Sequence, residues 1–214
     1  MTILPSGEEI EVVDNSSKKR PARKGGWKKY YVFDFNLRYQ PDNIRLVNEP
    51  PLDLRTPEGQ HCGFRPLPEA PKIVIEHKGS RELLDISQRF SDEKHFISDR
   101  LQEVISSIDS KSCAFVRCEV EMTDGGLAPN YWICEVAQIL YAFDDEFSNY
   151  KKSRRPGRDW VYSVGYPHPL CIKDDIVGGA HLFRLKLPDG RASLQAYCDD
   201  TFRAACLDAS NVAL

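Results

Sequence analysis

The sequence predicts an α+β protein, with an antiparallel or mixed sheet and a few short helices packed on it. Several short segments alternate apolar and polar residues, which is the period of a strand with one solvated face. Seven prolines lie between residues 36 and 71 and exclude a long helix there. Residues 98–108 and 199–207 each begin with a capping residue and are expected to continue as a helix.

Composition and charge limit the class of protein. The 214 residues are 41% hydrophobic and 29% charged, as in an ordinary globular protein. The formal net charge of −3 is too close to neutral for general binding to nucleic acid or to an anionic membrane surface. No apolar run approaches the ~18–20 residues that span a bilayer, and the acidic amino terminus lacks the pattern of a secretory signal. We therefore expect a cytoplasmic protein with no membrane partner.

The seven cysteines fit the same compartment. They are scattered, odd in number and mostly set among apolar neighbours, whereas disulfide frameworks are more often even in number and secreted. No C-x-x-C spacing occurs, so a zinc site is not predicted. We expect reduced, buried thiols, and neither a metal nor a cofactor.

Three segments are expected along the chain. Residues 1–29 are expected to form a flexible, charged leader. Its basic stretch 18–29 is either a flexible solvated arm, which the low hydrophobicity favours, or a phosphate-binding segment. Residues 30–80 hold a first strand and the prolines, and residues 81–214 hold the main α+β domain. A single compact domain over 30–214 is the alternative.

The first half of the chain contains the clearest helix. Aromatic and β-branched residues at 30–35 predict the first strand, and clean alternation at 72–77 predicts another. Residues 98–108 predict a helix, because Ser98 is a natural N-cap and Asp99 favours the positive end of the helix dipole. The apolar residues of this segment share one helical face: Leu101, Val104, Ile105 and Ile108.

Strands dominate the second half. Residues 113–122 alternate and predict one strand, a turn follows at 123–126, and 131–143 is its simplest antiparallel partner. A helix over 131–143 stays possible, because its apolar residues also share a helical face. Residues 148–160 are expected to form a basic surface loop, and Asp199 or Asp200 to cap a last helix. The remaining strands are short: 160–164, 169–172 and 181–187.

Sequence signatures of catalysis do not occur. The glycine-flanked serine of hydrolases, the phosphate-binding loop, the zinc-protease pattern and the dinucleotide glycine pattern are all missing from the sequence. Of five histidines, His168 is the best candidate base, because Pro167 and Pro169 hold it stiffly. An enzyme whose site is assembled from distant Asp, His and Cys residues stays an alternative, since spacing along the chain does not exclude it.

Three consecutive carboxylates follow the apolar run: Asp144, Asp145 and Glu146. Consecutive side chains point to alternating faces, so a metal or acid–base site would need partners from elsewhere in the chain. An element end that enters solvent explains the cluster better. The neighbouring basic residues, flanked by Tyr150 and Trp160, suggest a nucleic-acid-binding module over 18–29 and 150–160 as another alternative. The adjacent acids would repel phosphates, so we do not expect a nucleic-acid partner.

The order of several short motifs resembles a known family. Residues 81–208 contain SDRLQEVISSID, FVRCEVEMTDGG, YWICEVAQILYAFDDEFS, HLFRL and AYCDDTFRAACLDA. This order is similar to immunity family eleven, a family of bacterial polymorphic-toxin immunity proteins, and YYVFDF resembles its first strand. The chain departs from the pattern in its ending, LDASNVAL, in its basic leader and in its basic loop. The matching residues are Ser98, Asp99, Leu101, Phe115, Val116, Asp144, Ser148, Phe183, Arg184, Asp200 and Phe202.

The resemblance implies a non-enzymatic cytoplasmic inhibitor that binds a cognate toxin or effector, commonly a nuclease, encoded by an adjacent gene. It also implies structural roles for Ser98, Asp144, Ser148, Phe183 and Arg184. Carboxylates on an inhibitor can mimic the phosphates that a nuclease holds, and aromatic residues beside them anchor an interface. By charge and position, we expect the toxin to contact Asp145, Glu146, Tyr150, Arg154, Arg155 and Trp160.

Overall fold

A computed structural model gives the fold, which is α+β with mixed and antiparallel sheets, as predicted. The chain divides into two compact units. Unit 1 comprises Met1–Lys29, Ile139–Gly179 and Arg184–Ser193, and unit 2 comprises Tyr30–Gln138, Ala180–Phe183 and Leu194–Leu214. The structure describes residues 2–3, 9–14, 28–33, 43–48, 50, 52, 54–55, 63–76, 85–88, 94–154, 159–164 and 170–209.

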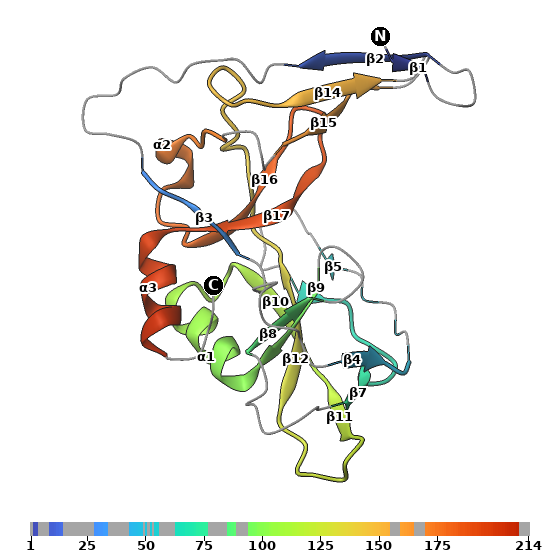
Figure 1. Cartoon of the computed structure of the whole chain (residues 1–214). Coiled ribbons are helices and arrows are strands. Elements are labelled where there is room, and N and C mark those ends of the chain that lie inside the picture. Colours follow the sequence, from blue (N-terminus) through green and yellow to red (C-terminus); the bar gives the residue numbers. More distant parts are fainter. Residues whose placement is uncertain are drawn as a thin grey trace. The chain divides into compact units, whose positions relative to one another are not determined.

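The centre of unit 2 is an antiparallel sheet with the strand order β10-β12-β9-β8. Helices α1 and α3 lie side by side in this unit (Figure 1). Leu101 and Ile105 of α1 and Phe202 of α3 are fully buried in a core that also takes in Ile97 and Leu182. The bounds are β8 Ile86–Gln88, β9 Lys94–Ser98, α1 Asp99–Ile108, β10 Cys113–Arg117, β12 Tyr131–Val136 and α3 Asp200–Asp208.

The predicted helices are confirmed together with their caps. The side chain of Ser98 accepts a hydrogen bond from the Leu101 N–H, and Asp199 accepts one from the Phe202 N–H. Each cap satisfies a backbone donor that the first helical turn leaves without a partner. The Ser98 hydroxyl also donates to the buried carboxylate of Asp85, which Arg100 contacts through two nitrogens.

A second sheet in unit 2 has the order β11-β7-β4, with β11 parallel and β4 antiparallel to β7. Its inward residues, Ile73 and Ile75, pack with Phe96, Tyr131 and Ile133 in a second cluster. A short pair, β5 and β6, completes the described strands of the 43–76 region. The bounds are β4 Asn43–Leu46, β5 Leu54–Arg55, β6 Gly63–Phe64, β7 Lys72–Glu76 and β11 Glu119–Met122.

Two predicted long strands are each interrupted. Residues 113–122 form β10 and β11, which belong to different sheets, so only β10 is the antiparallel partner of β12. The strand predicted over 131–143 ends at Val136, because the N–H groups of Ala137 and Gln138 both turn to the Ser112 carbonyl (2.8 and 3.1 Å). The helical alternative for this segment is wrong.

In unit 1 the main sheet has the antiparallel order β1-β2-β14-β15. The prediction of a surface loop over 148–160 is therefore wrong in part, because β14 lies inside it. Its charged residues form a strand because β2 and β15 pair with the backbone of β14 on both sides. The bounds are β1 Thr2–Ile3, β2 Glu9–Asp14, β14 Lys151–Arg154 and β15 Val161–Ser163. Residues 1–29 were predicted as a flexible leader. Strands form at 2–3 and 9–14, and the flexibility of the rest stays a prediction.

The last sheet has the order β13-β16-β17-β3, and residues of β16 and β17 are divided between the two units. The strand predicted at 30–35 is confirmed over its described part as β3, and the one at 181–187 as β16, whereas the described residues of 169–172 contribute only the isolated bridge Phe143↔Ile172. None of the helices in the described ranges is long and apolar enough to cross a membrane. The bounds are β3 Tyr31–Phe33, β13 Ile139–Leu140, α2 Asp174–Val177, β16 Leu182–Lys186 and β17 Ala192–Cys198.

Replacing the α1 cap tests the local energetics of unit 2. Ser98→Ala removes the acceptor for the Leu101 N–H and the hydroxyl that donates to Asp85. We expect a loss of about 1–2 kcal/mol in the free energy of unfolding, measured by urea titration. Ser107→Ala, on the exposed side of the same helix, is the control and should change stability by less than about 0.5 kcal/mol. Equal stability of wild type and Ser98→Ala would contradict the capping role.

His95 makes the stability of unit 2 depend on pH. His95 is 7% exposed, its Nδ1 has no hydrogen-bond partner among the described residues, and its ring packs edge-on against Phe33. Burial lowers the pKa of His95 to about 4 from 6.5. Between these values the unfolded chain binds a proton at His95 that the native chain does not bind, so acidification destabilises the fold.

We expect this linkage to remove about 3 kcal/mol of stability between pH 6.5 and pH 4, at ~1.4 kcal/mol per pKa unit. The measurement is urea unfolding at several pH values for wild type and His95→Gln, which stays neutral throughout. Carboxylates titrate in both proteins, so the difference between the two curves isolates His95. Parallel curves would show that His95 is not the titrating group.

Candidate partner-binding surface

The acidic turn of unit 1, defined here as residues 144–148, has one carboxylate that bonds to the backbone of the turn and two that are exposed. Asp144 is half-buried, and its Oδ1 accepts hydrogen bonds from the N–H groups of Glu146 (3.2 Å) and Phe147 (3.3 Å). The Ser148 N–H donates to the Asp144 carbonyl (2.9 Å), which closes the turn. Asp145 and Glu146 are exposed. Asp144 therefore shapes the turn, while its two neighbours present their charge to solvent.

Ser148 ties the acidic turn to the segment around Cys171. Its buried hydroxyl donates to the Cys171 carbonyl (3.1 Å) and accepts from the Cys171 N–H (2.9 Å). The Asp144 N–H donates to the same carbonyl (3.1 Å), and the Cys171 thiol donates to the Phe147 carbonyl (3.1 Å). Two backbone groups of Cys171 thus bond to one buried hydroxyl, and with the two further bonds they hold the turn in one conformation.

The strands β14 and β15 build a second feature, the basic–aromatic face, defined here as Lys152, Arg154 and Trp160. Lys152 pairs with Tyr162, and continuing the register places Arg154 opposite Trp160 on the same face of the ribbon. The Lys152 Nζ and the Arg154 Cζ lie 4.8 and 4.7 Å from the centroid of the Trp160 ring. These are cation–π distances, so the indole already has two cationic neighbours.

Tyr150 does not lie at the surface where the sequence placed it. Its side chain is 7% exposed and packs against Phe143 and Tyr162, with ring centroids 6.0 and 5.2 Å away. The prediction of an exposed aromatic anchor at Tyr150 is therefore corrected: the ring packs inside unit 1. Arg155, the other predicted interface residue of this stretch, lies outside the described residues.

Tyr162 links the acidic turn to the basic–aromatic face. Burial raises its pKa, and the negative charges of Asp145 and Asp189 act in the same direction. Asp189 accepts the Tyr162 N–H (2.9 Å), and the Arg191 guanidinium bonds both Asp189 (2.8 Å) and the Tyr162 carbonyl (3.1 Å). Tyr162 lies 27 residues from Asp189 in the chain, so no local pattern of the sequence indicates this contact.

Phe183 and Arg184, two further residues of the family pattern, lie inside the fold. Phe183 is fully buried, and its ring meets Tyr30 edge to face at 5.6 Å. Arg184 is 5% exposed, and its Nε donates to the Ser193 carbonyl (2.7 Å). The Ser193 hydroxyl in turn accepts the Leu185 N–H (2.9 Å). None of these side chains, nor the Ser98 cap, presents a polar group for a partner.

The comparison with protein families covers almost the whole chain. The model of the immunity protein family (Imm11) matches residues 29–213. The chain belongs to this family. The matched region contains both the acidic turn and the basic–aromatic face, and it extends the resemblance found over residues 81–208. No curated protein matches the chain.

The buried thiols of this immunity protein are poor nucleophiles. Burial raises the pKa of Cys118, Cys198 and Cys206 to about 12, so the reactive thiolate is scarce at neutral pH. Among the described residues, no three His, Cys, Asp or Glu side chains gather as metal ligands do. His181 Nδ1 lies 3.0 Å from the Asp199 carboxylate, which also caps α3. His168, the histidine singled out as a candidate base, is outside the described ranges.

Removing the Ser148 hydroxyl tests how strongly the acidic turn is held. Ser148→Ala leaves the N–H and carbonyl of Cys171 without this partner in a buried site. We expect a loss of about 1–3 kcal/mol in unfolding free energy, because the Cys171 N–H is left unsatisfied in a buried site while the Cys171 carbonyl keeps the Asp144 N–H. Glu146→Gln, in the same turn but exposed, should stay within about 0.5 kcal/mol of wild type. A Ser148→Ala protein as stable as Glu146→Gln would contradict the assignment.

Proposed function

We propose that this member of the immunity protein family neutralises a cognate toxin by binding it directly, and that the toxin is a nuclease encoded by an adjacent gene. The observation that carries the proposal is the family match over residues 29–213. The family is one of immunity proteins, whose activity is to bind and block rather than to turn over a substrate. The inhibitor acts without a metal or cofactor.

The acidic turn supports a nuclease as the target. Asp145 and Glu146 are exposed on a turn whose backbone is fixed by Asp144 and Ser148. A nuclease needs positive charge to hold phosphates, so carboxylates at fixed positions on its inhibitor complement it electrostatically. Because the turn is already ordered, binding does not have to restrict it further, which favours affinity.

The basic–aromatic face supplies a different kind of contact. Trp and Arg are the residues that most often dominate the energy of an interface. Trp160 is half-buried and Arg154 is exposed, so a partner can cover the indole and the guanidinium together. Tyr150 is removed from the proposed interface because it is buried. The proposed contact residues are therefore Asp145, Glu146, Arg154 and Trp160, with Arg155 retained as a prediction from the sequence.

The decisive test uses the product of the neighbouring reading frame, carried on a catalytically inactive background if it is toxic. Size-exclusion chromatography with light scattering followed by calorimetry should show a tight complex with the wild-type protein. The double charge reversal Asp145→Lys/Glu146→Lys should weaken binding at least about tenfold, or ~1.4 kcal/mol, because it replaces attraction with repulsion. It should also slow association more than it speeds dissociation.

The control makes the same change of charge elsewhere. Glu103→Lys/Asp208→Lys alters two exposed acids on α1 and α3 of unit 2. This variant should bind like wild type. If the acidic-turn variant and the control bind equally well, the acidic turn is not part of the interface. If the wild-type protein neither binds the neighbouring product nor relieves its toxicity, the proposed function itself is wrong.

A further inference from the structure

The segment that follows β10 is called here the first arm, and the segment that precedes β12 is called the second arm. The two arms separate instead of continuing the β10–β12 ladder. The last hydrogen bond between them runs from the Cys118 N–H to the Tyr131 carbonyl (2.9 Å). Continuing the β10–β12 register places Val120 opposite Pro129. This would be the next hydrogen-bonded pair of an antiparallel ladder, but proline has no N–H to donate. The arms therefore diverge at this point.

Beyond the divergence, β11 pairs with β7 on its other side. The Glu119 N–H donates to Pro71 (2.8 Å) and the Thr123 N–H donates to Ile75 (3.1 Å). In a parallel ladder, alternate residues bond to the same neighbour. The backbone N–H and carbonyl of Val120 consequently point away from β7. In the described part of the chain, β11 is the end strand of its sheet, so this edge has no strand beside it.

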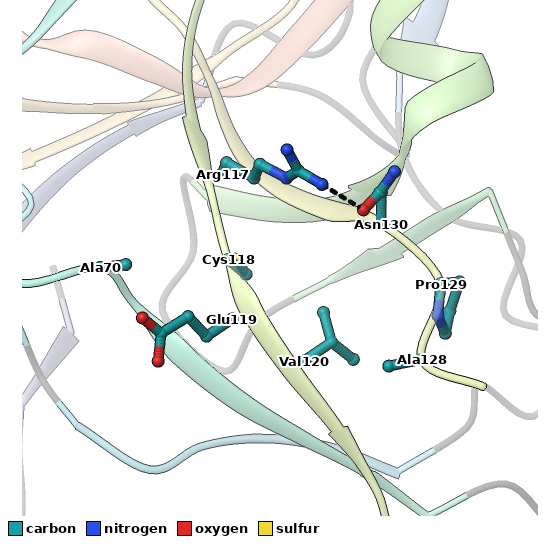
Figure 2. Close-up of a pocket in the computed structure, with 8 residues that line it drawn as sticks. All are labelled: Ala70, Arg117, Cys118, Glu119, Val120, Ala128, Pro129 and Asn130. Atoms are coloured by element: carbon teal, nitrogen blue, oxygen red, sulfur yellow. Dashed lines mark hydrogen bonds between the residues drawn. The ribbon is translucent and has the colours of Figure 1, made fainter. Parts of the chain in front are cut away.

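A pocket of 380 Å³ lies along this edge. Figure 2 shows Val120 on one side of it, with Ala128 and Pro129 on the other. Arg117 bonds the Asn130 side chain, and Asn130 also donates to Asp99 of α1. These bonds tie the second arm at Asn130 to the end of β10 and to α1. The gap is a feature of unit 2 with both polar and apolar walls, along a strand edge that has no strand beside it in the described part of the chain.

The charges along β11 decide which kind of strand can occupy the gap. Glu119 and Glu121 are exposed and alternate with the half-buried Val120 and Met122. Pairing with β11 of a second copy would bring these acids close to like charges, which is destabilising. A strand that carries Lys or Arg at alternate positions is complementary to them. Leu127, 99% exposed on the loop between the arms, offers such a strand an apolar contact.

We propose that the open edge of β11 receives an extended, basic segment of the toxin, which adds to the β11-β7-β4 sheet as a further strand. The main-chain groups of Val120 supply the hydrogen bonds, and Glu119 and Glu121 select basic side chains. Adding a strand to a free edge is a general mode of peptide recognition, in which the backbone gives affinity and alternate side chains give specificity. The inference rests on the proposed function, because it takes the toxin as the partner.

The sharpest variant is Val120→Pro, which deletes the N–H at the open edge and leaves the donors that pair with β7 in place. Calorimetry with the inactive product of the neighbouring frame should show at least about tenfold weaker binding. Glu121→Lys should weaken binding about fivefold, and the control Glu103→Lys, with the same change of charge on α1, should not weaken it. Amide exchange of wild type supplies a readout that needs no variant: Val120 should be slowed in the complex, whereas Glu121, already paired with β7, should change little.

The outcomes separate this inference from the proposed function. A tight complex in which the Val120 amide is not slowed, and in which Glu121→Lys binds as well as Glu103→Lys, overturns the edge assignment and leaves the immunity function intact. A wild-type protein that does not bind the neighbouring product overturns both. If Val120→Pro fails to fold, the exchange rate of Val120 and the Glu121→Lys comparison still decide the matter.

Discussion

The pairing of backbone N–H and carbonyl groups at Cys118 organises unit 2. The N–H of Cys118 belongs to the ladder with β12, and the N–H of Glu119 belongs to the ladder with β7. One continuous segment therefore contributes β10 to one sheet and β11 to another. Between them, Cys118 is buried in the cluster that joins Ile73 and Ile75 to Tyr131 and Ile133. A backbone N–H or carbonyl that is withdrawn from water has to bond to a neighbouring group. Pro129 has no N–H to pair with Val120, so the ladder with the second arm ends there. The backbone of β11 bonds to β7 instead, and the opposite edge of β11 stays open.

The same requirement explains unit 1. Residues Lys151–Arg154 have little intrinsic preference for a strand, yet β2 and β15 pair with them on both sides. The acidic turn is fixed by bonds between Ser148 and the backbone of Cys171 rather than by apolar packing of its own side chains. Charged side chains are thus displayed on rigid backbone. A net charge of −3 hides this local arrangement, in which acidic and basic surfaces lie on defined elements.

The sequence predicted the features whose causes are local. The caps at Ser98 and Asp199 follow from residues within three positions, and the apolar face of α1 follows from its own periodicity. Features that depend on distant partners were not visible. Nothing near β14 indicates that residues 9–14 pair with it, and Tyr150 was expected at the surface because its neighbours in sequence are charged. Pro129 is plain in the sequence, but its effect appears only when the β10–β12 register places it opposite Val120.

The acids on β11 illustrate how one feature can both protect a protein and select its partner. An open edge is a hazard, because any exposed strand can pair with it. Glu119 and Glu121 penalise pairing with another acidic strand, including β11 of another copy, while Lys72, 3.8 Å from Glu119, offsets only part of their charge. A basic strand removes the repulsion and gains hydrogen bonds at the same time. The free-energy difference between these two partners, rather than the strength of either contact, is what makes an edge specific. For the proposed function, in which the protein must remain available for one toxin, both consequences of the same two carboxylates are an advantage.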